Sequence, residues 1–151
     1  MLHCIGLFSI VHLFAAELIF TGLKMTALMV SKITAVGPEV EALLDGGVLI
    51  LFAEGAPAEL AEVSVCQRVE HADAKNKPVS GNSIKIAGIS SVITAVGELA
   101  WDKIIEMGHV VINYNGASIA ERPGEICAKT VDKAALLAAL KIGAQISIET
   151  A

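Results

Sequence analysis

The sequence predicts a mainly β protein, a single-domain barrel-like sheet of about seven strands with short helices and an internal two-fold repeat. Three observations support this prediction. A pentapeptide occurs twice, turn residues separate many short apolar or alternating runs, and 151 residues of 54% hydrophobic character suffice to bury one core. Short, numerous strands with little helix between them favour a closed or partly closed barrel over a parallel α/β sheet.

The repeated pentapeptide is Ile-Thr-Ala-Val-Gly, found at residues 33–37 and again at 93–97. A short amphipathic stretch, a glycine, an apolar run and a Gly-Ala pair follow each copy, the pairs standing at 55–56 and 116–117. Because the same order of features follows both copies, we expect two structurally related halves.

Period-two and apolar runs give the expected strands. They cover residues 28–36, 47–52, 62–69, 83–96, 109–114, 125–130 and 144–149. Glycine, proline and asparagine clusters provide the turns between them. Three short helices are expected at residues 39–44, 98–106 and 133–141, the last with Asp132 as N-cap and Gly143 as its stop. Trp101, in the second helix, is expected to anchor one end of the barrel.

Charge and cysteine content exclude some classes of function. A formal charge of −5 and a pI near 5.3 argue against nucleic-acid binding, which requires a basic face. The three cysteines form no disulfide framework and suit a reducing cytosol. A zinc site built from Cys66, His71, His109 and Cys127 has no supporting ligand spacing, so we predict no metal.

Residues 1–24 form an apolar N-terminal extension that differs from the rest of the chain. Its length approaches that of a membrane helix, but it contains Glu17 and lacks the basic start of a signal peptide. We expect a mis-assigned start, with translation beginning at Met25 and the domain spanning 25–151. A membrane anchor is the alternative.

Three segments resemble one known family. Residues 49–62 read Leu-Ile-Leu-Phe-Ala-Glu-Gly-Ala-Pro-Ala-Glu-Leu-Ala-Glu, residues 93–98 and 106–110 form a second block, and Pro123-Gly124 precedes a strand. In this order they resemble the glucitol/sorbitol-specific IIA component of the bacterial sugar phosphotransferase system (PTS), over about residues 25–149. The resemblance implies a cytoplasmic domain, associated with its membrane permease, that accepts a phosphoryl group from HPr on a histidine. It then passes the group to the IIB component of a hexitol permease (IIB/IIC), with no cofactor or metal.

The position that matches the family's acceptor histidine is Gln67, counted without a gap from Pro57. An amide nitrogen is not basic, so glutamine cannot carry a phosphoryl group as imidazole does. His71 is the candidate phosphoacceptor, on the same strand face as Gln67 if the strand continues. At about 3.3 Å per residue it would lie roughly 13 Å away, so it substitutes only if a bulge or loop moves it into the site.

The resemblance assigns supporting roles to other residues. His109 matches the second block and is expected to support the acceptor or to serve structure alone. The turn Glu54, Gly55, Ala56 and Pro57 is expected to form a wall of the site, with backbone amides free to hold phosphate. Arg68 could offset phosphate charge, although its strand parity opposes that of Gln67.

Three functions remain open from the sequence. They are a IIA phosphocarrier that uses His71, an acceptor-less relative that binds or regulates PTS partners, and a metal-binding or structural β-barrel module. Homo-oligomerisation is also open, because exposed strand edges either pair between copies or close within a barrel.

Overall fold

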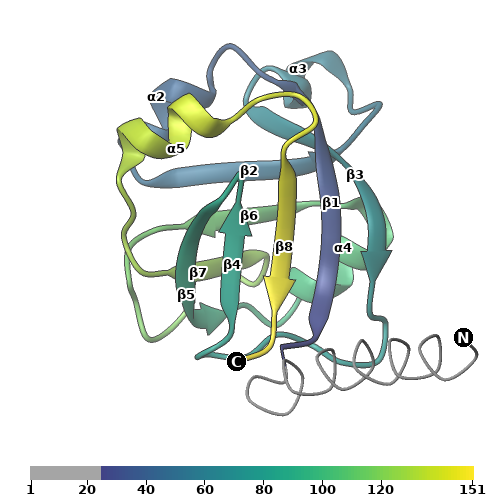
Figure 1. The fold of residues 1–151 in the computed structure, drawn as a ribbon, viewed down its shortest axis with the longest axis vertical. Coiled ribbons are helices and arrows are strands. Elements are labelled where there is room, and N and C mark those ends of the chain that lie inside the picture. The colour runs from purple at the N-terminus through teal and green to yellow at the C-terminus, as the bar shows by residue number, and fades with distance from the viewer. Residues whose placement is uncertain (1–24) are drawn as a thin grey trace, which may run out of the picture.

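A computed structural model describes residues 25–151, which form a closed barrel of eight strands (Figure 1). The predicted extension at residues 1–24 lies outside the described residues. The strands are β1 (Ala27–Val36), β2 (Val48–Ala53), β3 (Ser64–Ala72), β4 (Ser83–Ile86), β5 (Ile89–Val96), β6 (Val110–Asn113), β7 (Glu125–Ala128) and β8 (Gln145–Glu149). Around the barrel their order is β1-β3-β2-β6-β7-β5-β4-β8. The predicted mainly β barrel is confirmed.

The strand count is eight rather than seven because residues 83–96 form a hairpin instead of one strand. β4 and β5 pair antiparallel across the two-residue turn Ala87-Gly88, in which both residues have positive φ, 51° and 86°. Two consecutive positive φ values suit the right-handed twist of a tight hairpin. Alanine rarely adopts a positive φ, so Ala87-Gly88 is a weak sequence signal for a hairpin turn.

The two halves repeat the same pairing. β1 pairs antiparallel with β3, and β3 pairs parallel with β2; likewise β5 pairs antiparallel with β7, and β7 pairs parallel with β6. The antiparallel pair β2–β6 joins the halves. The predicted internal repeat is therefore a structural pseudo-two-fold that relates β1, β2 and β3 to β5, β6 and β7.

The repeated pentapeptide forms the same bend in both halves. The register shifts between Ile33 and Ala35 in one half and between Ile93 and Ala95 in the other. The chain then passes so close to its neighbour that a Cβ on Gly37 would lie 2.2 Å from a carbonyl oxygen, and one on Gly97 would lie 2.4 Å from another. Only glycine fits at these two positions, which explains why both copies end in this residue.

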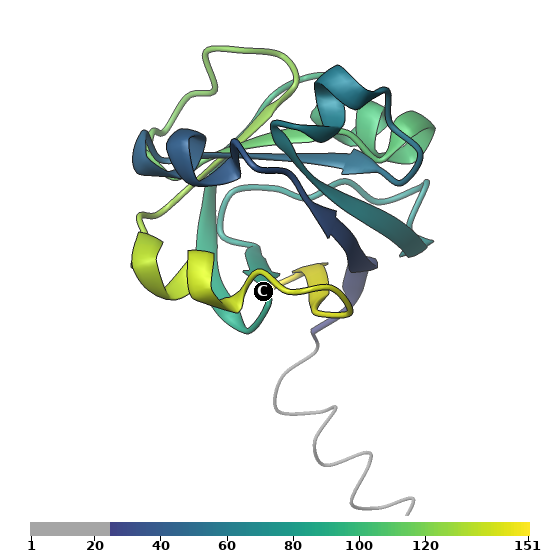
Figure 2. The same cartoon turned by 90° about the horizontal axis from the view of Figure 1, so that it is seen from above.

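Short helices cover the barrel: α2 (Val40–Asp45), α3 (Ala58–Ala61), α4 (Ala100–Met107) and α5 (Lys133–Ala139). α2 and α5 lie together on one side and α4 on the opposite side (Figures 1 and 2). The Asp132 carboxylate accepts a hydrogen bond from the Ala135 amide, as predicted for an N-cap. α3 was not predicted, because four residues are too few to show a helical period.

The core fills the barrel with aliphatic side chains and is closed by α4. Ala100, Trp101 and Ile104 of this helix are buried. The indole N–H of Trp101 donates to the Asp73 carbonyl at 2.9 Å, just beyond the end of β3. The anchoring role predicted for Trp101 matches this position.

Two further features bear on how the domain meets its surroundings. Each of the strands β1–β8 has a neighbour on both sides, so closure pairs the edges that could otherwise join two copies. Within residues 25–151 there is no helix with the length and apolar character needed to span a bilayer.

Candidate functional site

Gln67 lies on β3 and is fully buried, at 0% exposure. Its side-chain oxygen accepts a 2.5 Å hydrogen bond from the Ser31 hydroxyl on β1, and its amide nitrogen donates to the Gly108 carbonyl at 2.9 Å. β3 thus presents Gln67 between β1 and the C-terminal end of α4. Both ends of the amide are engaged, which is what a buried polar side chain requires.

A surface pocket of about 310 Å³ opens beside Gln67. Its lining combines Glu54 and Arg68 with Ile105 and Met107 from α4. Ile105 and Met107 are exposed, at 40% and 44%. Gln67, which the sequence resemblance led us to expect at the family's acceptor position, is therefore buried at the base of an accessible depression with an apolar rim.

The turn Glu54, Gly55, Ala56 and Pro57 adjoins the same place. The Glu54 amide donates to the Gln67 carbonyl at 2.8 Å, and Gly55 adopts a φ of 83° that favours glycine. Glu54 lines the pocket, whereas the other three residues do not. The structure thus brings this predicted wall next to Gln67, with Glu54 as the point of contact.

His71 lies on the other side of the sheet from Gln67. Ser31 pairs with Val69 and Val30 with His71, so Glu70 is an extra residue in β3, a β-bulge. The bulge reverses the alternation of side chains, and His71 is exposed while Gln67 is buried. The predicted β3 does continue through His71, but the bulge turns that side chain away from the Gln67 pocket.

His109 immediately precedes β6 and is half-buried. Its Nδ1 lies 3.2 Å from the Leu51 carbonyl oxygen, and its ring packs on Phe52 with centroids 5.0 Å apart. A carbonyl oxygen only accepts hydrogen bonds, so Nδ1 carries the hydrogen and Nε2 is left as the basic nitrogen. The two neighbours fix both the tautomer and the orientation of the ring.

A second pocket, of about 280 Å³, contains His109 together with Lys103, Arg122 and Glu125. The Lys103 ammonium lies over Gly124, 3.4 Å from the point that a Cβ there would occupy. Glu125 is 3% exposed, and its Oε1 accepts hydrogen bonds from the amides of Glu121 and Arg122. Its carboxylate is therefore held by the 121–122 loop.

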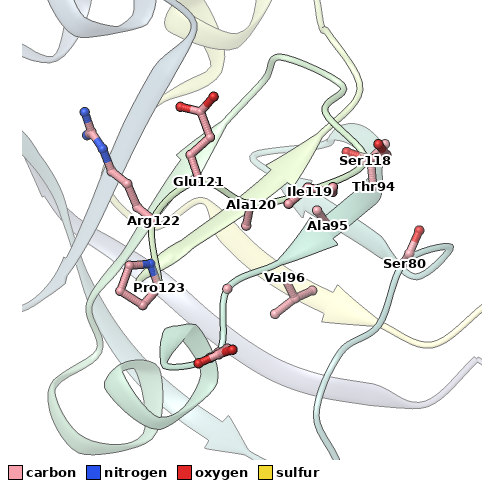
Figure 3. Close-up of a pocket in the computed structure, with 12 residues that line it drawn as sticks. Ser80, Thr94, Ala95, Val96, Ser118, Ile119, Ala120, Glu121, Arg122 and Pro123 are labelled. Atoms are coloured by element: carbon pink, nitrogen blue, oxygen red, sulfur yellow. The ribbon is translucent and has the colours of Figure 1, made fainter.

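A pocket of about 540 Å³ lies beside the second copy of the pentapeptide (Figure 3). Thr94, Ser80 and Ser118 give it a polar wall, and Arg122 lies at its rim with the guanidinium pointing away from Thr94. Among residues 25–151, the buried hydroxyl of Thr94 has no hydrogen-bond partner, and neither has that of Thr34 in the first copy. Because the same orphan hydroxyl occurs in both halves, we attribute it to the shared bend rather than to a ligand site.

The described cysteines are buried thiols, Cys66 and Cys127. Burial raises the pKa of Cys66, and burial with the adjacent Glu125 carboxylate raises the pKa of Cys127 to about 11. A raised pKa leaves little thiolate, the reactive form, at neutral pH. In the described part of the chain, no three His, Cys, Asp or Glu side chains form a group suited to a metal ion.

Sequence reasoning did not identify Ser31 and Gly108 as partners of Gln67, or Lys103 and Arg122 as neighbours of His109. These contacts join segments far apart in the chain, so no local pattern reveals them. A residue-by-residue comparison of the two repeats would have singled out Lys103 and Arg122, because the half containing β5–β7 carries charged side chains where the other half does not.

Two comparisons of the sequence with known proteins point to one family. Residues 28–147 match the family model of the PTS system glucitol/sorbitol-specific IIA component. The chain is 34% identical over 102 residues to the PTS system glucitol/sorbitol-specific EIIA components of Shigella flexneri and Escherichia coli (strain K12), covering 68% of this chain and 81% of each relative.

A solved structure is similar in fold. The crystal structure of a PTS system IIA component from Enterococcus faecalis V583 has a TM-score of 0.59 and 18% identity, over 78% of this chain and 97% of that chain. At this identity the likeness establishes the fold alone. The family match and the curated relatives establish more: the chain belongs to the family of PTS system glucitol/sorbitol-specific IIA components.

Proposed function

We propose that this chain is a phosphoryl carrier that accepts the group from HPr on a histidine and passes it to the IIB component during glucitol/sorbitol uptake. The observation that supports this most is the match to the family model over residues 28–147, which spans nearly all of the barrel. Neutral imidazole is nucleophilic near pH 7, and the resulting phosphoimidazole keeps a high transfer potential.

The surroundings of the Gln67 pocket suit a protein that meets two partners in turn. A transient interface needs a modest apolar patch with charge around it. Ile105 and Met107 provide apolar surface beside Glu54, Arg68 and Glu106. We propose that HPr and the IIB domain of a IIB/IIC permease dock on this face in a cytoplasmic location.

A second function is favoured by one specific observation. Gln67 occupies the position that matches the family acceptor, and both ends of its amide are hydrogen-bonded in the interior. A side chain this well satisfied is stable as an amide and offers no nucleophile. The alternative is therefore an acceptor-less relative that binds PTS partners and regulates them without phosphoryl transfer.

One experiment separates the two. The full chain and a Gln67→His variant are each incubated with phosphoenolpyruvate, enzyme I and HPr, and intact mass is read at alkaline pH, where phosphohistidine survives. The carrier proposal expects one phosphoryl group on the wild type. Phosphorylation of Gln67→His alone would favour the acceptor-less relative, and phosphorylation of neither folded protein would contradict both the carrier role and a productive HPr site at this pocket.

A further inference from the structure

We propose that His109, rather than His71, is the phosphoryl acceptor of this chain, in a basic pocket formed with Lys103 and Arg122. The proposal rests on the carrier function above and assigns its site. Three observations lead to it: a departure from the pseudo-two-fold at this pocket, the hydrogen bonding of the imidazole, and the position of the two cations.

The pseudo-two-fold identifies the counterpart of each pocket residue. Gly37 packs under the carbonyls of Ala61 and Glu62, as Gly97 packs under those of Arg122 and Pro123. Gly37 and Gly97 also donate to the carbonyls of Ser64 and Glu125, respectively. The structural equivalents of Arg122 and Glu125 are therefore Ala61 and Ser64.

The same comparison extends to Lys103 and His109. The Leu43 amide donates a hydrogen bond to the Glu39 carbonyl, and the Lys103 amide donates in the same way to the Leu99 carbonyl. In the β2–β6 pair, Val48 lies opposite Asn113. The pseudo-two-fold exchanges β2 with β6, so it relates Val48 to His109 and Asn113 to Phe52. The equivalents of Lys103 and His109 are thus Leu43 and Val48.

One half therefore builds this corner with Leu43, Val48, Ala61 and Ser64, and the other with Lys103, His109, Arg122 and Glu125. Because the first half keeps the same backbone arrangement without any charged side chain among these four, the fold does not require the cluster. Of the four, Glu125 is buried, Lys103 and His109 are half-buried, and Arg122 is exposed. Burying a carboxylate has a cost in free energy, so a cluster with Glu125 at its base that the scaffold can do without points to chemistry.

The imidazole is prepared for attack through one nitrogen. The Leu51 carbonyl holds the hydrogen on Nδ1, and packing on Phe52 fixes the ring plane. Within the described residues, no hydrogen bond engages Nε2. A nucleophile oriented by a partner on its other nitrogen is the arrangement that histidine catalysis uses. The outward-facing His71 shares a pocket with neither Lys103 nor Arg122.

The two cations suit a phosphoryl group. Lys103 reaches the pocket from α4, and Arg122 from the loop before β7, with its guanidinium pointing away from Thr94 (Figure 3). Together they exceed the single negative charge of Glu125, whose Oε1 is already engaged by the loop amides. Lysine and arginine donors stabilise the equatorial oxygens of a transferring phosphoryl group.

The step balances without a cofactor. The Nε2 lone pair of His109 attacks phosphorus, and the donor's N–P bond breaks as the new N–P bond forms. A donor phosphohistidine protonated on its other ring nitrogen leaves as neutral imidazole. His109 keeps its Nδ1 proton, hydrogen-bonded to the Leu51 carbonyl, so the cationic phosphoimidazole moves from one protein to the other and no proton is consumed.

The test compares matched histidine variants of the full chain, His109→Gln and His71→Gln, under phosphoenolpyruvate, enzyme I and HPr. Intact mass at alkaline pH gives the extent of phosphorylation, and tandem mass spectrometry of wild-type fragments gives the position. We expect the label on His109, an unchanged rate in His71→Gln, and no detectable label in His109→Gln. Lys103→Gln and Arg122→Gln should each slow labelling roughly ten- to a hundredfold, whereas Lys85→Gln, on an exposed position of β4, should not.

Each outcome decides between the proposals. A wild-type label on His71 would overturn the assignment of His109 and leave the carrier function intact. Labelling of Gln67→His without labelling of the wild type would overturn both the assignment and the carrier function of the natural chain. Circular dichroism checks the fold of His109→Gln, and if that variant does not fold, the fragment position in the wild type decides alone.

Discussion

Gln67 is held at both ends of its amide, by the Ser31 hydroxyl and by the Gly108 carbonyl, at 0% exposure. Gln67→Leu keeps similar volume but leaves both partners without their bonds in the interior. We expect it to lower the free energy of unfolding by about 2 kcal/mol, measured by urea denaturation. Gln145→Leu, at an exposed glutamine of β8, is the matched control and should stay within about 0.5 kcal/mol of wild type. Equal stability of the two variants would contradict the assigned role of Gln67.

Cys127 links stability to alkaline pH. Burial and the Glu125 carboxylate hold its pKa near 11, above its ordinary value of 9.0. Between these values the folded chain keeps the thiol protonated while the unfolded chain ionises it, so stability is fully present below about pH 9 and is lost as pH rises toward 11. In Cys127→Ala, the free energy of unfolding should decline less steeply over this window, by up to about 1 kcal/mol per pH unit. Parallel curves for variant and wild type would contradict this linkage.

The residues of the site were only partly predictable. Counting from Pro57 is sufficient to place Gln67 beside the Glu54 turn, because both lie on one continuous stretch of chain. The orientation of His71 was not predictable, because the bulge at Glu70 depends on how β1 pairs with β3. The same holds for Lys103 and Arg122, which come from separate elements to meet His109.

At the scale of elements, the repeated pentapeptide is explained by the bend that ends β1 and β5. Gly97→Ala would place a Cβ 2.4 Å from the Pro123 carbonyl oxygen, where backbone must move. We expect a loss of more than about 4 kcal/mol of stability, or no folded protein. Gly46→Ala is the control, since its φ of −81° is ordinary and a Cβ there would lie 3.4 Å from the nearest heavy atom.

The control variant should be as stable as wild type or more stable by up to about 1 kcal/mol, because alanine restricts the unfolded chain. Thermal unfolding of the two variants compares them directly. A folded Gly97→Ala protein with wild-type stability would mean that the close approach at the end of β5 is not what fixes glycine there.

Elements with a strong local signal were predicted, and those without one were not. The Asp132 cap indicates the start of α5, and the periodic apolar face of α4 indicates a helix there. The division of residues 83–96 into β4 and β5 was missed because Ala87-Gly88 is a weak turn signal, and tertiary pairing of β4 with β8 compensates for the unusual alanine. Barrel closure could be expected from strand number, but the order of the strands could not.

At the scale of the whole molecule, one scaffold is used twice with different side chains. The Gln67 pocket lies between β2 and β3 of one half and α4 of the other, whereas the pocket of His109 is lined by the half containing β5–β7 alone. Consecutive residues between α4 and β6 line the two pockets: Gly108, whose carbonyl accepts from Gln67, lines the first, and His109 lines the second.

The most direct test of the carrier function is a chase experiment. The full chain is loaded with labelled phosphoryl group from phosphoenolpyruvate through enzyme I and HPr, separated from them, and mixed with the IIB domain of a glucitol/sorbitol permease. We expect label to leave the chain and to appear on IIB in equal amount. A folded chain that takes up no label, or one that keeps its label when IIB is added, would contradict the carrier function.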